Sequence, residues 1–129
     1  MKTKILLIED NEQNRYLATF LLEQCGHEVV PAESGPLGLE LAATICPDLI
    51  LLDIQLPGMD GHAVARALRS NPTLAAVPIV AVTSYAMVGD REKVMASGCN
   101  GYLEKPINPD TFVTEIESFL PPPEKAGTP

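Results

Sequence analysis

Basic residues are scarce in this chain: nine lysines and arginines stand against seventeen aspartates and glutamates, for a formal net charge of −8. A protein this acidic does not attract phosphate backbones over long range, which argues against nucleic-acid binding and against an anionic membrane surface. Charged residues still make up 20% and apolar residues 46% of the chain, as in ordinary globular proteins. We therefore do not expect disorder of the whole chain.

Cysteines and long apolar runs are also rare. Cys25, Cys46 and Cys99 are odd in number and match no zinc or redox spacing, so we expect plain buried or half-buried thiols. Near the N-terminus only residues 5–8 form a strongly apolar run, which is too short for a signal-peptide core or a membrane span. These features predict a cytoplasmic protein, and its 129 residues fit one domain with its own core.

What the chain does contain is an alternation of strand-like and helix-like stretches. Strands are expected at 5–8, 28–31, 48–53, 78–83 and 101–104, and helices at 14–25, 34–46, 60–70, 90–97 and 109–120. The run 48–53 is apolar on both faces, which is typical of a parallel sheet covered by helices on each side, whereas 28–31 is less apolar and is expected near an edge. The alternation predicts a three-layer, doubly wound α/β fold with five parallel strands. We expect one domain over 1–120 and a flexible proline-rich tail or linker stub over 121–129.

Polar side chains follow four of the five expected strands. Glu9 and Asp10 follow the first strand, Asp53 ends the third, Thr83 ends the fourth, and Lys105 follows the fifth. Ligands of such sheets bind outside the carboxyl ends of the strands. We therefore expect three acids, one hydroxyl and one lysine to meet at one edge of the sheet, although each of them alone would be read as a cap, turn or loop residue.

These residue types fit phosphoryl transfer. Crowded carboxylates repel one another and call for a cation, and Mg²⁺ prefers oxygen ligands of this kind. A carboxylate can act as a nucleophile that forms an aspartyl phosphate, and the transfer needs positioning and charge neutralisation above all. We assign Asp53 as the nucleophile, because it ends a strand buried on both faces, and place Glu9 and Asp10 on the metal side. Thr83 is suited to donate a hydrogen bond to a phosphoryl oxygen, and Lys105 to neutralise its charge.

The segments around these residues resemble a known family. The sequence reads IEDN at 8–11, LDIQLPGMDG at 52–61, VAVT at 80–83 and KP at 105–106. Together they are similar to the receiver domain of two-component response regulators, which has the CheY-like variant of the flavodoxin-like fold, and the likeness runs from about residue 4 to residue 120. The sequence is equally similar to single-domain regulators of the DivK type and to receivers fused to hybrid histidine kinases.

The resemblance implies a phosphorelay role centred on Asp53. This residue matches the phosphoacceptor, and the donor would be a histidine kinase or a histidine phosphotransfer protein. Mg²⁺ would be held by Glu9, Asp10, Asp53 and the backbone carbonyl of Gln55. The domain would catalyse only its own phosphorylation and dephosphorylation.

The resemblance also implies a switch. Thr83 and Lys105 match the residues that contact the phosphoryl group, and Tyr102 matches an aromatic residue that reorients with Thr83 on activation. The target protein would bind the face formed by the fourth helix, fifth strand and fifth helix. The bond between Lys105 and Pro106 is expected to be cis.

Positions two residues beyond the aspartate and the threonine, here Gln55 and Tyr85, tune the lifetime of the phosphoryl group in the family. The sequence does not give the direction of that effect. His27 precedes the second expected strand, and His62 lies at the start of an expected helix. We therefore expect both to be ordinary solvated residues that do not reach the acidic edge.

Three other functions would use similar residues. A phosphatase of the haloacid dehalogenase type needs a second acid two residues after the nucleophile, where this chain has Gln55. A flavodoxin-like FMN carrier needs a phosphate-cradling first loop, whereas Glu9, Asp10 and Glu12 would repel a phosphate. The complete set of site residues argues against a binding-only receiver that is never phosphorylated, an alternative that the sequence leaves open.

Overall fold

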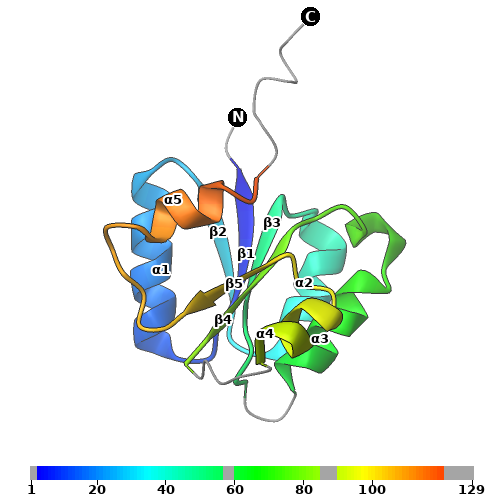
Figure 1. The fold of residues 1–129 in the computed structure, drawn as a ribbon. Coiled ribbons are helices and arrows are strands. Elements are labelled where there is room, and N and C mark those ends of the chain that lie inside the picture. The colour runs from blue at the N-terminus through cyan, green and yellow to red at the C-terminus, as the bar shows by residue number, and fades with distance from the viewer. Residues whose placement is uncertain (1–2, 57–59, 85–89, 121–129) are drawn as a thin grey trace, which may run out of the picture.

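The computed structural model describes residues 3–56, 60–84 and 90–120 and contains one parallel sheet between two layers of helices (Figure 1). The strands are β1 (Lys4–Ile8), β2 (Glu28–Ala32), β3 (Leu49–Asp53), β4 (Ile79–Thr83) and β5 (Gly101–Glu104). Their order in the sheet is β2-β1-β3-β4-β5, and every neighbouring pair is parallel. The predicted doubly wound fold is confirmed, with β2 at an edge as its weaker apolar pattern indicates.

Helices cover both faces of the sheet, as Figure 1 shows. One layer holds α1 (Glu12–Gln24) and α5 (Phe112–Glu117), and the other holds α2 (Gly35–Ile45), α3 (Gly61–Arg69) and α4 (Asp90–Ala96). A 3-10 turn, Pro72–Leu74, follows α3. Within the described part of the chain, no helix has the length and apolarity needed to cross a membrane.

The core is divided into two halves by the alternation of side chains along the strands. On β3, Ile50 and Leu52 pack in the half beneath α2, α3 and α4. Leu49 and Leu51 of the same strand pack in the half beneath α1 and α5. All five residues of β3 are buried, as are all five of β4, so the central strands are rigidly placed and hold Asp53 in a fixed position.

Side-chain caps and glycines set the helix ends. Asn11 accepts a hydrogen bond from the Asn14 backbone N–H (2.9 Å), so α1 begins at Glu12, before the expected residue 14. Asp60 caps α3 as its sequence position indicates, by accepting from the His62 backbone N–H (3.1 Å). The chain leaves α1 at Gly26, whose φ is +91°, a conformation that favours glycine.

Two expectations about isolated side chains are wrong. Cys25 and Cys46 are exposed because they lie at the C-caps of α1 and α2, on the surface, whereas Cys99 is buried as expected. His27 is not solvated: it is buried, and its Nε2 lies 2.8 Å from Oε2 of Glu117 in α5.

Candidate functional site

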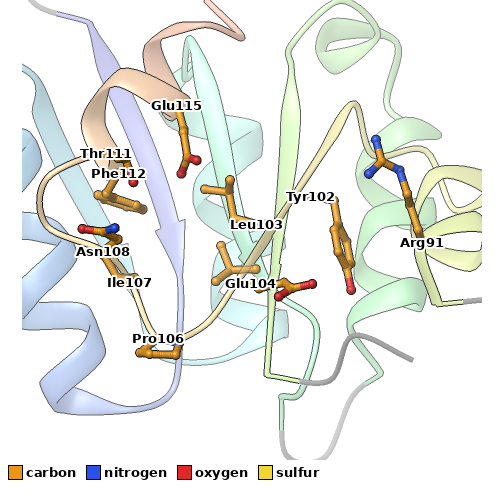
Figure 2. Close-up of a pocket in the computed structure, with 11 residues that line it drawn as sticks. Arg91, Tyr102, Leu103, Glu104, Pro106, Ile107, Asn108, Thr111, Phe112 and Glu115 are labelled. Atoms are coloured by element: carbon orange, nitrogen blue, oxygen red, sulfur yellow. The ribbon is translucent and has the colours of Figure 1, made fainter. Parts of the chain in front are cut away.

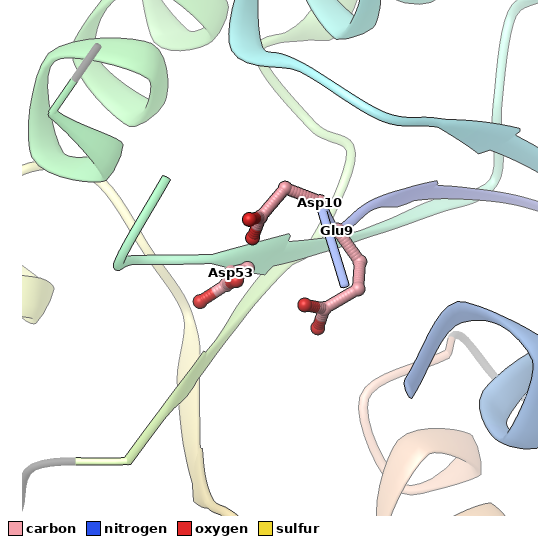
Figure 3. Close-up of side chains that lie close together, drawn as sticks. All are labelled: Glu9, Asp10 and Asp53. Atoms are coloured by element: carbon pink, nitrogen blue, oxygen red, sulfur yellow. The ribbon is translucent and has the colours of Figure 1, made fainter. Parts of the chain in front are cut away.

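The carboxyl ends of β1 and β3 bring three acids together. One carboxylate oxygen from each of Glu9, Asp10 and Asp53 lies within 4.8 Å of the others. Figure 3 shows these side chains converging beyond the strand ends. Glu9 and Asp53 are each only 3% exposed, whereas Asp10 is open to solvent. The three acids therefore lie together at one edge of the sheet, as predicted. Asp10 is on the exposed side of the cluster, and Glu9 and Asp53 are on the buried side.

Lys105 supplies positive charge to this cluster. Its Nζ lies 3.1 Å from Oε1 of Glu9 and 3.3 Å from Oδ2 of Asp53. The chain reaches this position just after β5, and the Lys105–Pro106 peptide bond is cis, as expected from the family resemblance. The lysine thus contacts both buried carboxylates, including the proposed nucleophile.

Gln55 and Thr83 form the other side of the cluster. The backbone N–H of Gln55 donates to Oδ1 of Asp53 (2.9 Å), and its side-chain Nε2 donates to Oγ1 of Thr83. Its Oε1 accepts from the backbone N–H of Ser84 (3.0 Å). Sequence reasoning assigned Gln55 only a backbone carbonyl and an influence on lifetime; its position two residues after Asp53 was the available signal for the side-chain role.

Arg15 is a site residue that sequence reasoning missed. Its Nη1 donates to the backbone carbonyls of Glu9 (3.0 Å) and Asp10 (3.2 Å) and so fixes the segment that carries the acids. An arginine in the first turns of a helix normally indicates a solvated position, and no pattern in the sequence singles this one out.

The electrostatics of the cluster favour a bound cation. Burial, and after it the hydrogen bond and charge of Asp53, raise the pKa of Glu9 from 4.5 to about 7, although Lys105 acts in the opposite direction. Burial and Asp53 likewise raise the pKa of Asp10. One lysine does not balance three carboxylates, and the available ligands are all hard oxygen atoms. This donor set fits Mg²⁺.

Tyr102 lies on β5, where it pairs with Ala81 of β4 and packs, half-buried, against the core half beneath α2, α3 and α4. In Figure 2 its ring points toward the end of the sheet that carries the acids. Tyr85 lies outside the described residues. Neither His27 nor His62 belongs to the acidic cluster found among the described residues, as expected.

Comparisons with known proteins agree with this geometry. Residues 5–117 match the family model of the response regulator receiver domain. The chain is 41% identical over 120 residues to the polar-differentiation response regulator DivK of Brucella ovis, covering 93% of this chain and 98% of the relative.

Solved structures give the same result. The chemotaxis response regulator CheY4 of Vibrio cholerae matches with a TM-score of 0.89 and 28% identity, over 93% of this chain and 100% of that one. The receiver domain of the sensor histidine kinase PA1611 of Pseudomonas aeruginosa, described with a magnesium ion coordinated in its active-site cleft, matches with a TM-score of 0.84 and 32% identity, over 92% and 98%. The chain therefore belongs to the response regulator receiver domain family, whose members are phosphoacceptors in two-component signalling.

Proposed function

We propose that Asp53 is the phosphoacceptor and that the phosphoryl group comes from a phosphohistidine of a histidine kinase or a histidine phosphotransfer protein. The observation that carries this assignment is the set of contacts on its carboxylate. Oδ1 accepts the Gln55 backbone N–H, Oδ2 faces the Lys105 ammonium, and two further acids lie beside it. A carboxylate held in this way by a rigid strand is positioned for in-line attack on phosphorus.

The reaction forms one bond and breaks one. A carboxylate oxygen of Asp53 attacks the phosphorus, the P–N bond of the phosphohistidine breaks, and the imidazole nitrogen keeps the electron pair. Lys105 stays close to the oxygens and offsets the charge that they gain. The product is an acyl phosphate on Asp53, a position from which Thr83 and Lys105 contact the new oxygens.

Receiver domains bind Mg²⁺ at their acidic pocket, and we propose that Glu9, Asp10, Asp53 and the Gln55 backbone carbonyl hold it here. The ion supplies charge neutralisation for the transferring group. The crowding of the carboxylates and the raised pKa of Glu9 support this assignment. The magnesium ion described for the PA1611 receiver supports it by analogy.

We propose that the downstream target protein binds the α4-β5-α5 face. A pocket of about 400 Å³ lies there (Figure 2). Its lining includes the apolar residues Leu103, Ile107 and Phe112 and the charged residues Arg91 and Glu115. Phosphorylation would draw Thr83 and Lys105 toward the new charge and turn Tyr102 inward, which shifts the population toward the form that the target protein binds. We also propose a cytoplasmic location, on family membership alone.

Mass spectrometry of the intact protein tests the acceptor. After incubation with MgCl₂ and acetyl phosphate, the wild-type protein is expected to gain one phosphoryl group, and Asp53→Asn none. Asp110→Asn, which changes an exposed aspartate in the segment before α5, is the matched control and should be labelled like the wild type. Labelling that survives in Asp53→Asn would overturn the assignment, and a wild-type protein that takes up no phosphoryl group would favour a binding-only receiver.

A further inference from the structure

The side chain of Gln55 spans the gap between the ends of β3 and β4. Its Oε1 accepts from the backbone N–H of Ser84 (3.0 Å), and its Nε2 lies against Oγ1 of Thr83. The direction of both bonds follows from chemistry, because a backbone N–H can only donate. Oε1 must therefore face Ser84, so Nε2 faces Thr83 and donates to its hydroxyl oxygen. One amide thus holds two consecutive residues at the point where the chain leaves β4.

Gln55 is bonded to the reacting centre as well. Its backbone N–H donates to Oδ1 of Asp53 (2.9 Å), so a single residue is joined to the acceptor by its backbone and to Thr83 by its side chain. Thr83 is only 3% exposed, and a buried hydrogen bond at that position restricts its movement. When Thr83 turns its hydroxyl toward a phosphoryl group on Asp53, the bond from Gln55 must break or form again in a new geometry.

We propose that Gln55 is a positioning residue that acts through Thr83: its side-chain amide is a latch that favours the unphosphorylated arrangement of Thr83 and Ser84. This proposal rests on the function proposed for Asp53 and deepens it, because the latch sets how far the switch is biased before phosphorylation. A neutral hydrogen bond of this kind is expected to bias the equilibrium about two- to tenfold. Its loss should move the unphosphorylated protein toward the activated arrangement by that factor.

Gln55→Met tests the latch, because methionine keeps the length of the side chain but neither donates nor accepts these bonds. The backbone groups that serve Asp53 and the metal stay in place. Gln24→Met is the matched control, since Gln24 is an exposed glutamine at the end of α1 and lies outside the acidic cluster. Thermal melts first establish that both variants are folded.

The first readout is made without metal or phosphoryl donor. We expect the Ser84 amide proton of Gln55→Met to exchange faster with solvent than in the wild type. Its Thr83 and Ser84 backbone resonances should move along the line that joins the wild-type positions without and with Mg²⁺ and beryllofluoride, a phosphoryl analogue. Exchange and resonances that match the wild type would overturn the latch.

The second readout is the apparent affinity for beryllofluoride in MgCl₂. A ligand that selects the activated arrangement binds more tightly when that arrangement is already populated, so the affinity of Gln55→Met should rise about two- to tenfold while Gln24→Met is unchanged. A lower affinity in Gln55→Met would mean that the amide binds the phosphoryl group directly, and the latch would be wrong. A wild-type protein that does not bind the analogue would instead overturn the role of Asp53, and the exchange of the Ser84 amide still decides on the latch.

Discussion

At the scale of single residues, the electrostatic strain of the site is concentrated in Glu9. Its carboxyl group is buried beside Asp53, and its pKa rises from 4.5 to about 7. The folded protein therefore keeps a proton on Glu9 at pH values where the unfolded chain has lost it. Between about pH 4.5 and 7, the folded state binds more protons than the unfolded state, so stability falls as the pH rises through this window.

Without metal, the free energy of unfolding should decrease from pH 5 toward pH 8, and added MgCl₂ should reduce that decrease because the ion binds the ionised carboxylates. Urea denaturation at several pH values, with EDTA or with MgCl₂, measures both effects. The comparison with Glu9→Gln isolates the contribution of Glu9. Equal slopes in the wild type and Glu9→Gln would contradict the assignment.

The placement of the acids could be predicted from the sequence, and the direction of individual side chains could not. Asp53 and Glu9 follow apolar runs, and parallel topology alone brings the ends of such strands to one edge. The bonds of Gln55 to Thr83 and Ser84 depend on a rotamer that only packing decides. The residue pattern therefore predicts the phosphoryl chemistry, whereas only the structure shows the hydrogen bonds that join Gln55 to Thr83 and Ser84.

At the scale of elements, the end of α3 is tied to its neighbours by Arg69. Its Nε donates to the carbonyl of Gly98 (2.8 Å), and its Nη1 donates to those of Leu74 (2.8 Å) and Val77 (2.7 Å). Its Nη2 also contacts Asn100. Leu74 and Val77 lie between α3 and β4, and Gly98 and Asn100 lie between α4 and β5, so one guanidinium links two connections. The sequence correctly predicted that α3 ends before the Asn71-Pro72 pair. It did not predict the role of Arg69, because an arginine in the last turn of a helix ordinarily does no more than interact favourably with the helix dipole.

Arg69→Met should lower the free energy of unfolding by at least about 2 kcal/mol, because several carbonyls lose a charged donor. Lysine should rescue little of this loss, since one ammonium cannot reproduce the planar fork of donors. Arg66→Met, which changes an exposed arginine on the same helix, is the matched control and should stay within about 0.5 kcal/mol of the wild type. Urea denaturation of the variants gives the values, and equal losses in Arg69→Met and Arg66→Met would show that the network contributes nothing specific.

At the scale of the whole molecule, the connection between α1 and β2 is joined to the last helix, α5, by a contact between distant residues. The last helix is short, Phe112–Glu117, and buries Phe112 and Ile116 against the sheet. Oε2 of its final residue, Glu117, lies 2.8 Å from Nε2 of His27, which directly precedes β2 and is 90 positions away in the sequence. No local pattern in the sequence predicts such a pair, because a lone histidine is ordinarily expected to be solvated. The pair lies at the amino end of the strands, opposite the acidic cluster.

A change in this pair should therefore lower the stability of the protein without preventing phosphoryl transfer. Glu117→Ala leaves the buried Nε2 of His27 without its partner and should lower the free energy of unfolding by about 1–3 kcal/mol. Glu115→Ala, an exposed glutamate on the same helix, should change it by less than about 0.5 kcal/mol. Both variants should still take up one phosphoryl group from acetyl phosphate under conditions where they are folded, because the reacting residues at the carboxyl ends of the strands are untouched. A folded Glu117→Ala protein that is not phosphorylated would show that the far end of the molecule is coupled to Asp53, contrary to this separation.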